Sequence, residues 1–283
     1  MLSASIEEFW QELIADIKSN KLILPGLPEV TLRVRKLLDA KGGATASKIA
    51  TAISADAVLS TRLLRVVNSP LYRGANPIED IRGAVTRLGN ANVRNIVTSL
   101  AMEQIYQDRV ASPEKKRLLA HNREHSMIVA ALSWFIANRY TRLNAEEAML
   151  VGLIHDIGKL PIIEYAELAP ELADKAVFQR LLEVLHPRVG ALMLRSWKFS
   201  PELVAAVAEH ENFNHNPDTP ASYTDVVIVA NLLSHIGSDH PCTRLDWSTV
   251  PAFNRLKLRP EESIDAMKNA RGQINEVKQL LAA

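Results

Sequence analysis

The chain has 283 residues, of which 47% are hydrophobic, 23% charged and 5% aromatic, a composition typical of a soluble globular protein long enough to bury a core. A formal net charge of +1 excludes strong nonspecific attraction to nucleic acid or anionic membranes, and a single cysteine, Cys242, excludes an internal disulfide. The sequence contains no secretory signal and no apolar stretch long enough to span a bilayer, so we expect a cytoplasmic protein without membrane contact.

Helical spacing of apolar residues dominates the first part of the chain. An amphipathic helix is predicted over residues 3–19, where it should pack on the body of the domain. A turn at Pro25–Pro28 precedes a second helix, and Thr45–Ser54 is predicted to form a third. Asp56 is placed to cap a fourth helix, which should stop before Pro70 because proline disfavours helical geometry at the preceding residue.

The rest of the chain is also predicted to be helical, with glycine, asparagine and proline at the boundaries. Gly89 should separate a short helix from a longer one that Asn90 begins. Pro113 begins a long alanine-rich helix that extends to about Tyr140, and Asn144 caps the next helix. Further helices are predicted at about 170–185, 187–197, 201–210 and 222–237, followed by a connector over 241–251 and one final polar helix. No strand is predicted, so the expected fold class is all-α.

The strongest candidate for function is the segment Val151–Pro161, VGLIHDIGKLP. His155 and Asp156 stand side by side in it, and an imidazole nitrogen and a carboxylate oxygen are both ligands of first-row transition metals. Gly158, which can adopt a positive φ, is expected to end the helix just after the pair. An isolated His-Asp pair is more often a helix cap beside a core residue, so the metal interpretation depends on ligands from other helices.

Three further histidines, His125, His186 and His210, fall where helices would converge. Each alone is more often an ordinary core or surface histidine, whereas together they are what a metal site built from several helices requires. In a two-metal site, Asp156 would bridge the ions, and a bound water would lose a proton and attack phosphorus. Lys159 would then contact a phosphate; the alternative is a surface lysine.

The N-terminal part of the chain is basic. From Arg33 to Arg94, eleven lysines and arginines oppose four acidic residues, an excess of seven positive charges. A solvated face, with some arginines paired internally, is the simpler interpretation, and a docking surface for an acidic partner or nucleic acid is the alternative. Aromatic residues are not interleaved with these charges, which argues against binding to single strands.

Seven segments carry a resemblance to a known family: LPGLPEV, SKIATAISADAVLSTRLLRVVNSPLY, AVTRLGNANVRNIV, REHSMIVAALS, EEAMLVGLIHDIGKL, HPRVGALMLRSWKFSPELVAAVAEH and VVIVANLL. In this order they resemble the HDOD family, the output-domain branch of the HD superfamily in bacterial signalling proteins. The resemblance covers roughly residues 20–235 and implies a two-lobed, all-helical fold. Its expected parts are an N-terminal helix (1–20), an HDOD domain (21–235) with an N-terminal lobe (about 21–110) packed on an HD-like bundle (111–235), and a C-terminal connector and helix (236–283).

The metal pattern of the HD superfamily is a His, the His-Asp pair and a distant Asp, with extra histidines in two-metal members. The resemblance places His125 at the first position, His155 and Asp156 at the pair, and His186 and His210 at the extra histidines. The distant position holds Asn231, whose neutral amide binds metal less well than a carboxylate, and Asp225 six residues earlier does not match it. The GYP signature of cyclic-di-GMP phosphodiesterases is also absent after His210.

Three functions remain open from the sequence. The resemblance favours a signalling output or scaffold domain that acts through partner proteins without catalysis. The second is a metal-dependent phosphohydrolase or phosphodiesterase acting on a nucleotide or cyclic dinucleotide, and the third is a metal-bound but inactive domain whose ion braces the helices. We expect weak or partial binding of a divalent transition metal (iron, manganese, zinc or nickel), little or no hydrolysis of cyclic dinucleotides, signalling proteins as partners, and no nucleic acid.

Overall fold

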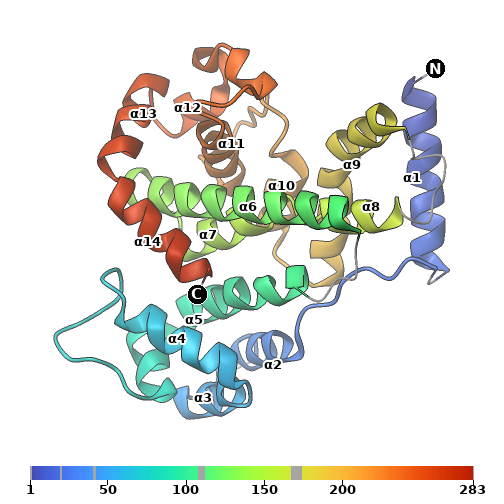
Figure 1. Cartoon of the computed structure of the whole chain (residues 1–283). Helices are drawn as coiled ribbons and strands as arrows, with labels where there is room; N and C mark the ends of the chain where they lie inside the picture. Colours follow the sequence, from blue (N-terminus) through green and yellow to red (C-terminus); the bar gives the residue numbers. More distant parts are fainter. Residues whose placement is uncertain (1, 20, 41–42, 108–111, 167–173, 283) are drawn as a thin grey trace.

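The computed structural model describes residues 2–19, 21–40, 43–107, 112–166 and 174–282, and every regular element in these ranges is helical, which confirms the predicted all-α class. Figure 1 shows α2 to α5 gathered on one side of the long helix α6, with α9 and α11 to α13 on the other. The elements are α1 (Leu2–Lys18), α2 (Glu29–Leu38), α3 (Ala46–Ser54), α4 (Ala57–Asn68), α5 (Ile81–Gln107), α6 (Pro113–Tyr140), α7 (Ala145–Ile154), α8 (Lys159–Tyr165), α9 (Lys175–Ser196), α10 (Pro201–Glu209), α11 (Tyr223–Ser234), η2 (Pro241–Arg244), η3 (Trp247–Thr249), α12 (Pro251–Arg255), α13 (Pro260–Asn269) and α14 (Arg271–Ala282).

Helices α2 to α5 form an N-terminal lobe, and side-chain caps fix where two of them begin. Thr45 accepts a hydrogen bond from the Lys48 amide (3.3 Å) at the start of α3, and Asp56 accepts one from the Leu59 amide (2.9 Å) at the start of α4. Gly89 has φ 76° and ψ 161°, which interrupts α5 and separates a short first segment from a longer second one. The predicted cap at Asp56 and the predicted break at Gly89 are both confirmed.

Helices α6 and α7 form the centre of the molecule. Pro113 begins α6 and Tyr140 ends it, as predicted, and Asn144 caps α7 by accepting a hydrogen bond from the Glu147 amide (2.7 Å). Helix α7 is buried along nearly its whole length because it packs against α5, α6 and α11. The residues that directly follow α7 therefore lie deep inside the protein. None of the described helices is long and apolar enough to cross a membrane.

Helix α9 runs without a break from Lys175 to Ser196, with Pro187 inside it. The prediction that one helix ends near 185 and another begins at Pro187 is therefore wrong, and the start expected at about 170 lies outside the described residues. An internal proline costs roughly 3 kcal/mol through its lost hydrogen bond and steric clash. Leu185 and Val189 beside it are fully buried, and since each such side chain contributes about 1.5–3 kcal/mol, packing outweighs that cost.

The C-terminal region, expected to contain one final helix, is divided into α12, α13 and α14. Lys257 adopts φ 56° and the Leu258 amide donates to the Phe253 carbonyl (2.9 Å), so a Schellman-type turn ends α12. Pro260 then begins α13. The last helix, α14, buries Ile274, Val277 and Leu281 along one face.

The N-terminal helix α1 packs on the body of the domain, as expected. Phe9 contacts Tyr165 of α8 edge to face, with ring centroids 5.6 Å apart. The guanidinium of Arg188 in α9 lies 4.2 Å from the centre of the Trp10 ring, a cation–π contact. Helix α1 thus covers α8 and α9 on the side of the molecule opposite α14 (Figure 1).

Helix α14 connects the N-terminal lobe to α6. Lys278 forms an ion pair with Glu124 of α6 (2.7 Å), and Arg62 of α4 donates to the Leu281 carbonyl (2.8 Å). Val277 and Leu281 are buried against these neighbours. The C-terminal extension is therefore part of the packed structure rather than an appendage.

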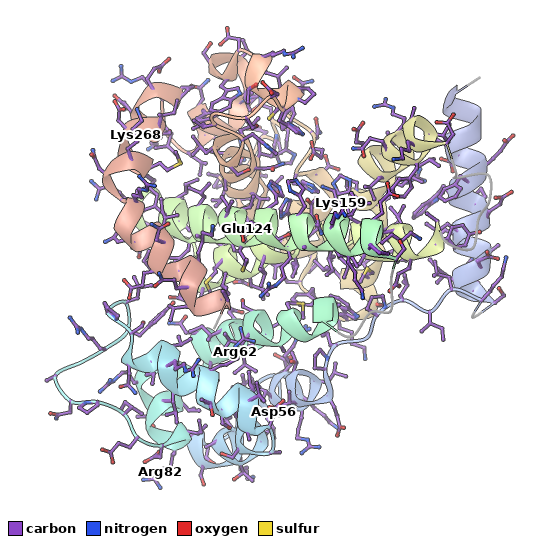
Figure 2. The ribbon with its side chains drawn as sticks, viewed as in Figure 1. Asp56, Arg62, Arg82, Glu124, Lys159 and Lys268 are labelled. Atoms are coloured by element: carbon purple, nitrogen blue, oxygen red, sulfur yellow. The ribbon has the colours of Figure 1, made fainter. Side chains whose placement is uncertain are left out.

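The excess positive charge of the N-terminal lobe is partly used in internal contacts. Arg35 donates to the Lys198 carbonyl (2.8 Å) and stacks on Phe199 (4.2 Å), and Arg62 also donates to the Leu100 carbonyl (2.8 Å). Figure 2 shows Arg82 at the outer edge of the lobe and Arg62 on the side that faces α14. These contacts favour the simpler interpretation, a solvated face with some arginines paired internally.

Candidate metal centre

The structure brings together all five residues that the sequence analysis placed at a metal site. They come from four parts of the bundle: α6, the turn after α7, α9 and the end of α10. Two groups of three result, in each of which the ligand atoms lie within 4.8 Å of one another. The first group is His125, His155 and Asp156; the second is Asp156, His186 and His210.

The turn that carries the His-Asp pair is held directly against α9. Gly158 was expected to end the helix with a positive φ, but its φ is −67°, so that expectation is wrong. The reason for glycine is the close approach of two backbones: a Cβ on Gly158 would lie 2.0 Å from the His186 carbonyl oxygen and 2.5 Å from the Gly190 amide nitrogen. The absent side chain lets Asp156 approach the imidazole of His186.

The distances within the centre are those of ligand atoms already close to a shared ion. The Nε2 atoms of His125 and His155 lie 3.3 Å apart, and those of His186 and His210 lie 3.1 Å apart. Asp156 Oδ1 lies 3.0 Å from His186 Nε2 and 3.5 Å from His210 Nε2. Ligand atoms about 2.0–2.1 Å from one zinc ion are separated by about 3.0–3.4 Å in tetrahedral or more compact arrangements. Three of these spacings fall in that range, and the spacing of 3.5 Å between Asp156 and His210 is slightly longer.

Backbone contacts define which ring nitrogen carries the hydrogen. The Nδ1 atoms of His155, His186 and His210 each lie 2.8 Å from a carbonyl oxygen, of Gly152, Leu182 and Val207 respectively. A carbonyl only accepts, so each Nδ1 donates and, in a neutral ring, each Nε2 is left as an acceptor. Such second contacts are typical of metal-binding histidines because they fix the tautomer and the ring orientation.

The charge states of these groups follow from burial and mutual proximity. Burial lowers the pKa of His155 and His186 and brings that of His125 to about 4, so these rings are neutral near pH 7. Burial opposes ionisation of Asp156, but neighbouring imidazoles and Lys159 hold the pKa of this carboxyl well below its usual value. For His210, burial is outweighed by contact with Asp156 and the charge of Glu211, which raise its pKa.

When His210 is neutral, the second group consists of acceptors that face one another. Asp156 Oδ1 is buried and has no hydrogen-bond partner among the described residues, although two imidazole Nε2 atoms are close to it. Three lone-pair-bearing atoms at this separation repel each other unless a cation lies between them. A proton on His210 would relieve part of this repulsion, whereas a transition metal would accept a lone pair from all three atoms. The donor set and its geometry thus fit a metal ion.

Lys159 lies at the outer edge of the centre. Its Nζ is 2.5 Å from Asp156 Oδ2, so it is paired with the central carboxylate and is not an ordinary surface lysine. The side chains of Lys159 and His125 are 24% and 15% exposed, whereas those of His155, Asp156, His186 and His210 are at most 2% exposed. Among these residues, solvent reaches the centre from the side of His125 and Lys159. Figure 2 marks Lys159 near α6.

Asn231 lies near the second group, as the resemblance implied. It is buried, its Oδ1 has no hydrogen-bond partner among the described residues, and its Nδ2 donates to Glu211 Oε1 (3.4 Å). Glu211, which the sequence analysis missed, has Oε1 3.7 Å from His210 Nε2; its position directly after His210 was the available signal. Asp225 instead forms an ion pair with Arg255 (2.7 Å), so it does not replace the missing carboxylate.

A second cluster of potential ligands lies next to this centre and was also missed. His235, His240 and Cys242 place ligand atoms within 4.8 Å of one another. The ring of His235 stacks between those of His125 (centroids 5.0 Å apart) and His240 (3.8 Å). The signal in the sequence was the short spacing of two histidines and the single cysteine, HIGSDHPC.

Comparison with known proteins relates most of the chain to one family. The HDOD domain matches residues 24–213. An uncharacterized protein of Treponema pallidum is 25% identical over 253 residues, 86% of this chain and 48% of that protein. Ribonuclease Y of Dehalococcoides mccartyi is 32% identical over 145 residues, 51% of this chain and 23% of that protein. The matched regions thus span about half or less of the length of these two relatives.

Solved structures share the whole fold. A Shewanella amazonensis protein named as a proposed metal-dependent phosphohydrolase is 25% identical, with a TM-score of 0.75 over 98% of this chain and 99% of that chain. An HDOD domain protein of unknown function from Geobacter sulfurreducens is 20% identical, with a TM-score of 0.69 over 95% and 96%. A Marinobacter aquaeolei protein named as a proposed signal transduction protein is 17% identical, with a TM-score of 0.63 over 99% and 66%. The last two likenesses concern the fold alone.

Proposed function

This chain belongs to the HDOD domain family, and we propose that it is a signalling output module whose helices are held together by a transition-metal centre at Asp156. In this proposal the module acts through partner proteins and turns over phosphodiesters slowly or not at all. The metal-binding residues are His125, His155, Asp156, His186 and His210.

The observation that carries the metal assignment is the convergence of three ligand atoms at a buried carboxylate oxygen, Asp156 Oδ1, that has no hydrogen-bond partner among the described residues. His186 Nε2, His210 Nε2 and Asp156 Oδ1 lie 3.0–3.5 Å apart, and the outward-facing Nδ1 atoms are already engaged with backbone carbonyls. Burying such a group without a cation would destabilise the fold, because each unsatisfied polar atom costs about 1–3 kcal/mol. A bound ion removes this cost and links three helical segments, the turn after α7, α9 and the end of α10.

Two observations favour a structural ion over a catalytic one. The position expected to provide a final carboxylate holds Asn231, whose neutral amide contacts Glu211. The second group of ligands is buried, with each side chain at most 2% exposed, so a phosphodiester has no open path to that side of Asp156. When bound, the ions would supply Lewis acidity and a water of lowered pKa, but this chain limits access to them.

The test is the metal content of protein prepared without chelators or nickel affinity resin. Wild type should retain iron, manganese, zinc or nickel, measured by elemental mass spectrometry. Asp156→Asn, which keeps the size of the side chain and removes its charge, should retain much less, and Asp218→Asn on an exposed loop should match wild type. Wild-type protein that stays free of metal after incubation with each of these ions would refute the assignment.

A metal-dependent phosphohydrolase is the second candidate. It is supported by Lys159 at the solvent-facing edge of the centre and by the 25% identical Shewanella protein named for that activity. A nucleotide or cyclic dinucleotide would be the substrate. Rapid hydrolysis of such a phosphodiester with added manganese or iron, abolished in Asp156→Ala, would replace the non-catalytic proposal with this one. Ribonuclease Y shares too little of its length with this chain to favour RNA as a substrate.

A further inference from the structure

We propose that His235, His240 and Cys242 form a second metal site, separate from the Asp156 centre, which takes zinc or another thiophilic divalent ion. The three residues share no ligand with the two groups around Asp156. They also lie outside residues 24–213, the part of the chain that the family matches.

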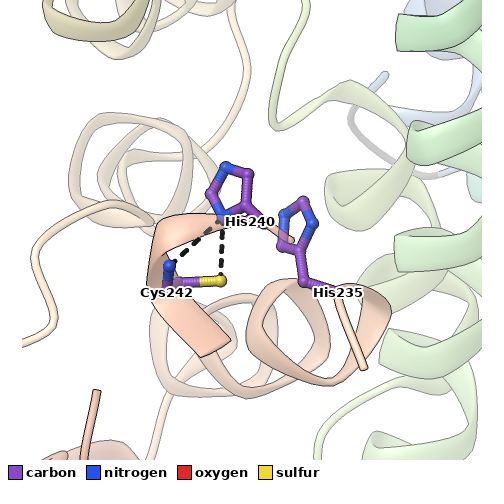
Figure 3. A group of neighbouring side chains, drawn as sticks. All are labelled: His235, His240 and Cys242. Atoms are coloured by element: carbon purple, nitrogen blue, oxygen red, sulfur yellow. Dashed lines mark hydrogen bonds between the residues drawn. The ribbon is translucent and has the colours of Figure 1, made fainter. Parts of the chain in front are cut away.

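The backbone between α11 and η2 places the three side chains together. His235 follows α11, Gly237 turns the chain with a φ of 81°, and His240 caps η2. Positive φ favours glycine, so this turn, which returns His240 over His235, is specified locally. Figure 3 shows the two rings on one side of the buried Cys242 thiol.

The contacts within the cluster put nitrogen and sulfur donors close to one another. His240 Nδ1 lies 2.9 Å from Cys242 Sγ and also accepts a hydrogen bond from the Cys242 amide (3.4 Å). All three ligand atoms lie within 4.8 Å of one another. Zinc binds both imidazole nitrogen and thiolate sulfur, and a zinc site with three protein ligands leaves the fourth position to water; the thiolate selects soft ions over magnesium or calcium.

Binding an ion here requires two local changes. Burial raises the pKa of Cys242 to about 11, so the free thiol is protonated, and binding releases that proton as the metal–sulfur bond forms. The rings of His235 and His240 are nearly parallel, at 11°, whereas a metal lies in the plane of each ligating ring. His240 is exposed while His235 is stacked on both faces, so His240 is the ring that would turn.

Such an ion would affect the neighbouring centre without belonging to it. His235 stacks on His125 with ring centroids 5.0 Å apart. His125 is itself a candidate metal ligand, in the group that it forms with His155 and Asp156. An ion on His235, His240 and Cys242 would hold the segment 235–242 over His125. The accessible edge of the Asp156 centre would then be partly covered.

Cobalt(II) provides a direct test because Cys242 is the single cysteine of the chain. A sulfur-to-cobalt charge-transfer band in the near ultraviolet can arise here and cannot arise at the Asp156 centre, which has no sulfur ligand. Cobalt added to the reduced protein should produce this band, which saturates when this site is filled, and zinc should abolish it. The band should persist in Asp156→Asn. The experiment therefore tests this site independently of whether the Asp156 centre binds a metal.

Variants distinguish a metal site with three ligands from metal binding by the Cys242 thiol alone. Cys242→Ser should lose the band, and His240→Ala and His235→Ala, which keep the thiol, should each weaken cobalt binding by at least about tenfold, since even partners outside the direct ligands contribute about 10–100-fold. His215→Ala, a histidine outside the cluster, should bind as wild type does. Folding of every variant is checked by its thermal midpoint. Absence of the band in wild type, or a band unchanged in both histidine variants, would overturn the proposal.

Discussion

The two clusters of potential metal ligands in this molecule are adjacent but differ in how the chain builds them. The Asp156 centre takes its residues from four helical segments that meet only in the folded bundle, and all but His125 are nearly fully buried. The second cluster lies within one short segment, His235 to Cys242, with His240 exposed.

This difference determines how each ion would be coupled to folding. An ion shared by distant helices binds the folded state and has no preformed site in the unfolded chain, so its binding free energy adds to global stability. An ion held by a single short segment stabilises mainly that segment.

Disrupting the close backbone contact between Gly158 and α9 should have the largest effect on the free energy of unfolding. Gly158→Ala should destabilise the fold by about 3 kcal/mol or more, at or above the upper end of the usual cost of overpacking, because its Cβ would lie 2.0 Å from the His186 carbonyl oxygen in α9. Metal retention should fall with it. Urea denaturation measures the change, and Gly272→Ala, where nothing lies within 4 Å, is the matched control, expected to be neutral or stabilising. Equal stability of the two variants would contradict the packing described here.

Metal removal should have the next largest effect. Stripping the Asp156 centre with a chelator should lower the free energy of unfolding by about 2.7 kcal/mol if the free metal had been 100-fold above its dissociation constant. Asp156→Asn should show a much smaller chelator response than wild type. Calorimetric thermal midpoints, with and without chelator, test this; a response of the same size in both proteins would place the stabilising ion elsewhere.

Restoring the missing carboxylate should change affinity and stability in opposite directions. Asn231→Asp should tighten metal binding by roughly tenfold, about 1.4 kcal/mol, because an anionic ligand replaces an amide. In the metal-free protein the same variant should be less stable, since a buried carboxylate would face Glu211, which Asn231 now contacts through its Nδ2 (3.4 Å). Competition with a coloured chelator gives the affinity, with Asn214→Asp on the exposed loop as control.

Loss of the second cluster should have the smallest effect on global stability. His240→Ala removes an exposed ring that caps η2, so the free energy of unfolding should fall by about 1 kcal/mol or less, the typical cost of a lost cap. Hydrogen exchange of the amides at 235–242 should nonetheless become faster. A large global destabilisation would mean that this segment is as closely coupled to the bundle as the Asp156 centre.

Features set by local chemistry were predictable from the sequence. Asp56 and Asn144 cap helices as expected because an N-cap depends on a few neighbouring residues. Pro187 and Gly158 were misjudged because tertiary packing decides their roles: one is kept helical by the buried face of α9, and the other is required by contact with the His186 backbone.

The residues of the candidate site divide in the same way. His125, His186 and His210 were singled out because they fall where helices would converge, and the family resemblance then gave each a position in the metal pattern. Nothing local to these histidines indicates that they meet at Asp156. Glu211 and the cluster of His235, His240 and Cys242 were missed because the family pattern has no place for them. Their proximity depends on the path of the chain after α10 and α11.

The most direct test of the central claim is anomalous diffraction at the absorption edge of the metal, from crystals of protein kept in excess manganese, iron or zinc. We predict an anomalous peak within coordinating distance of Asp156 Oδ1, His186 Nε2 and His210 Nε2, and a second peak between His125 and His155 when that group also holds an ion. A refined structure that has no peak at Asp156, and in which the His210 imidazole donates a hydrogen bond to the Asp156 carboxylate where the ion is expected, would contradict the metal assignment.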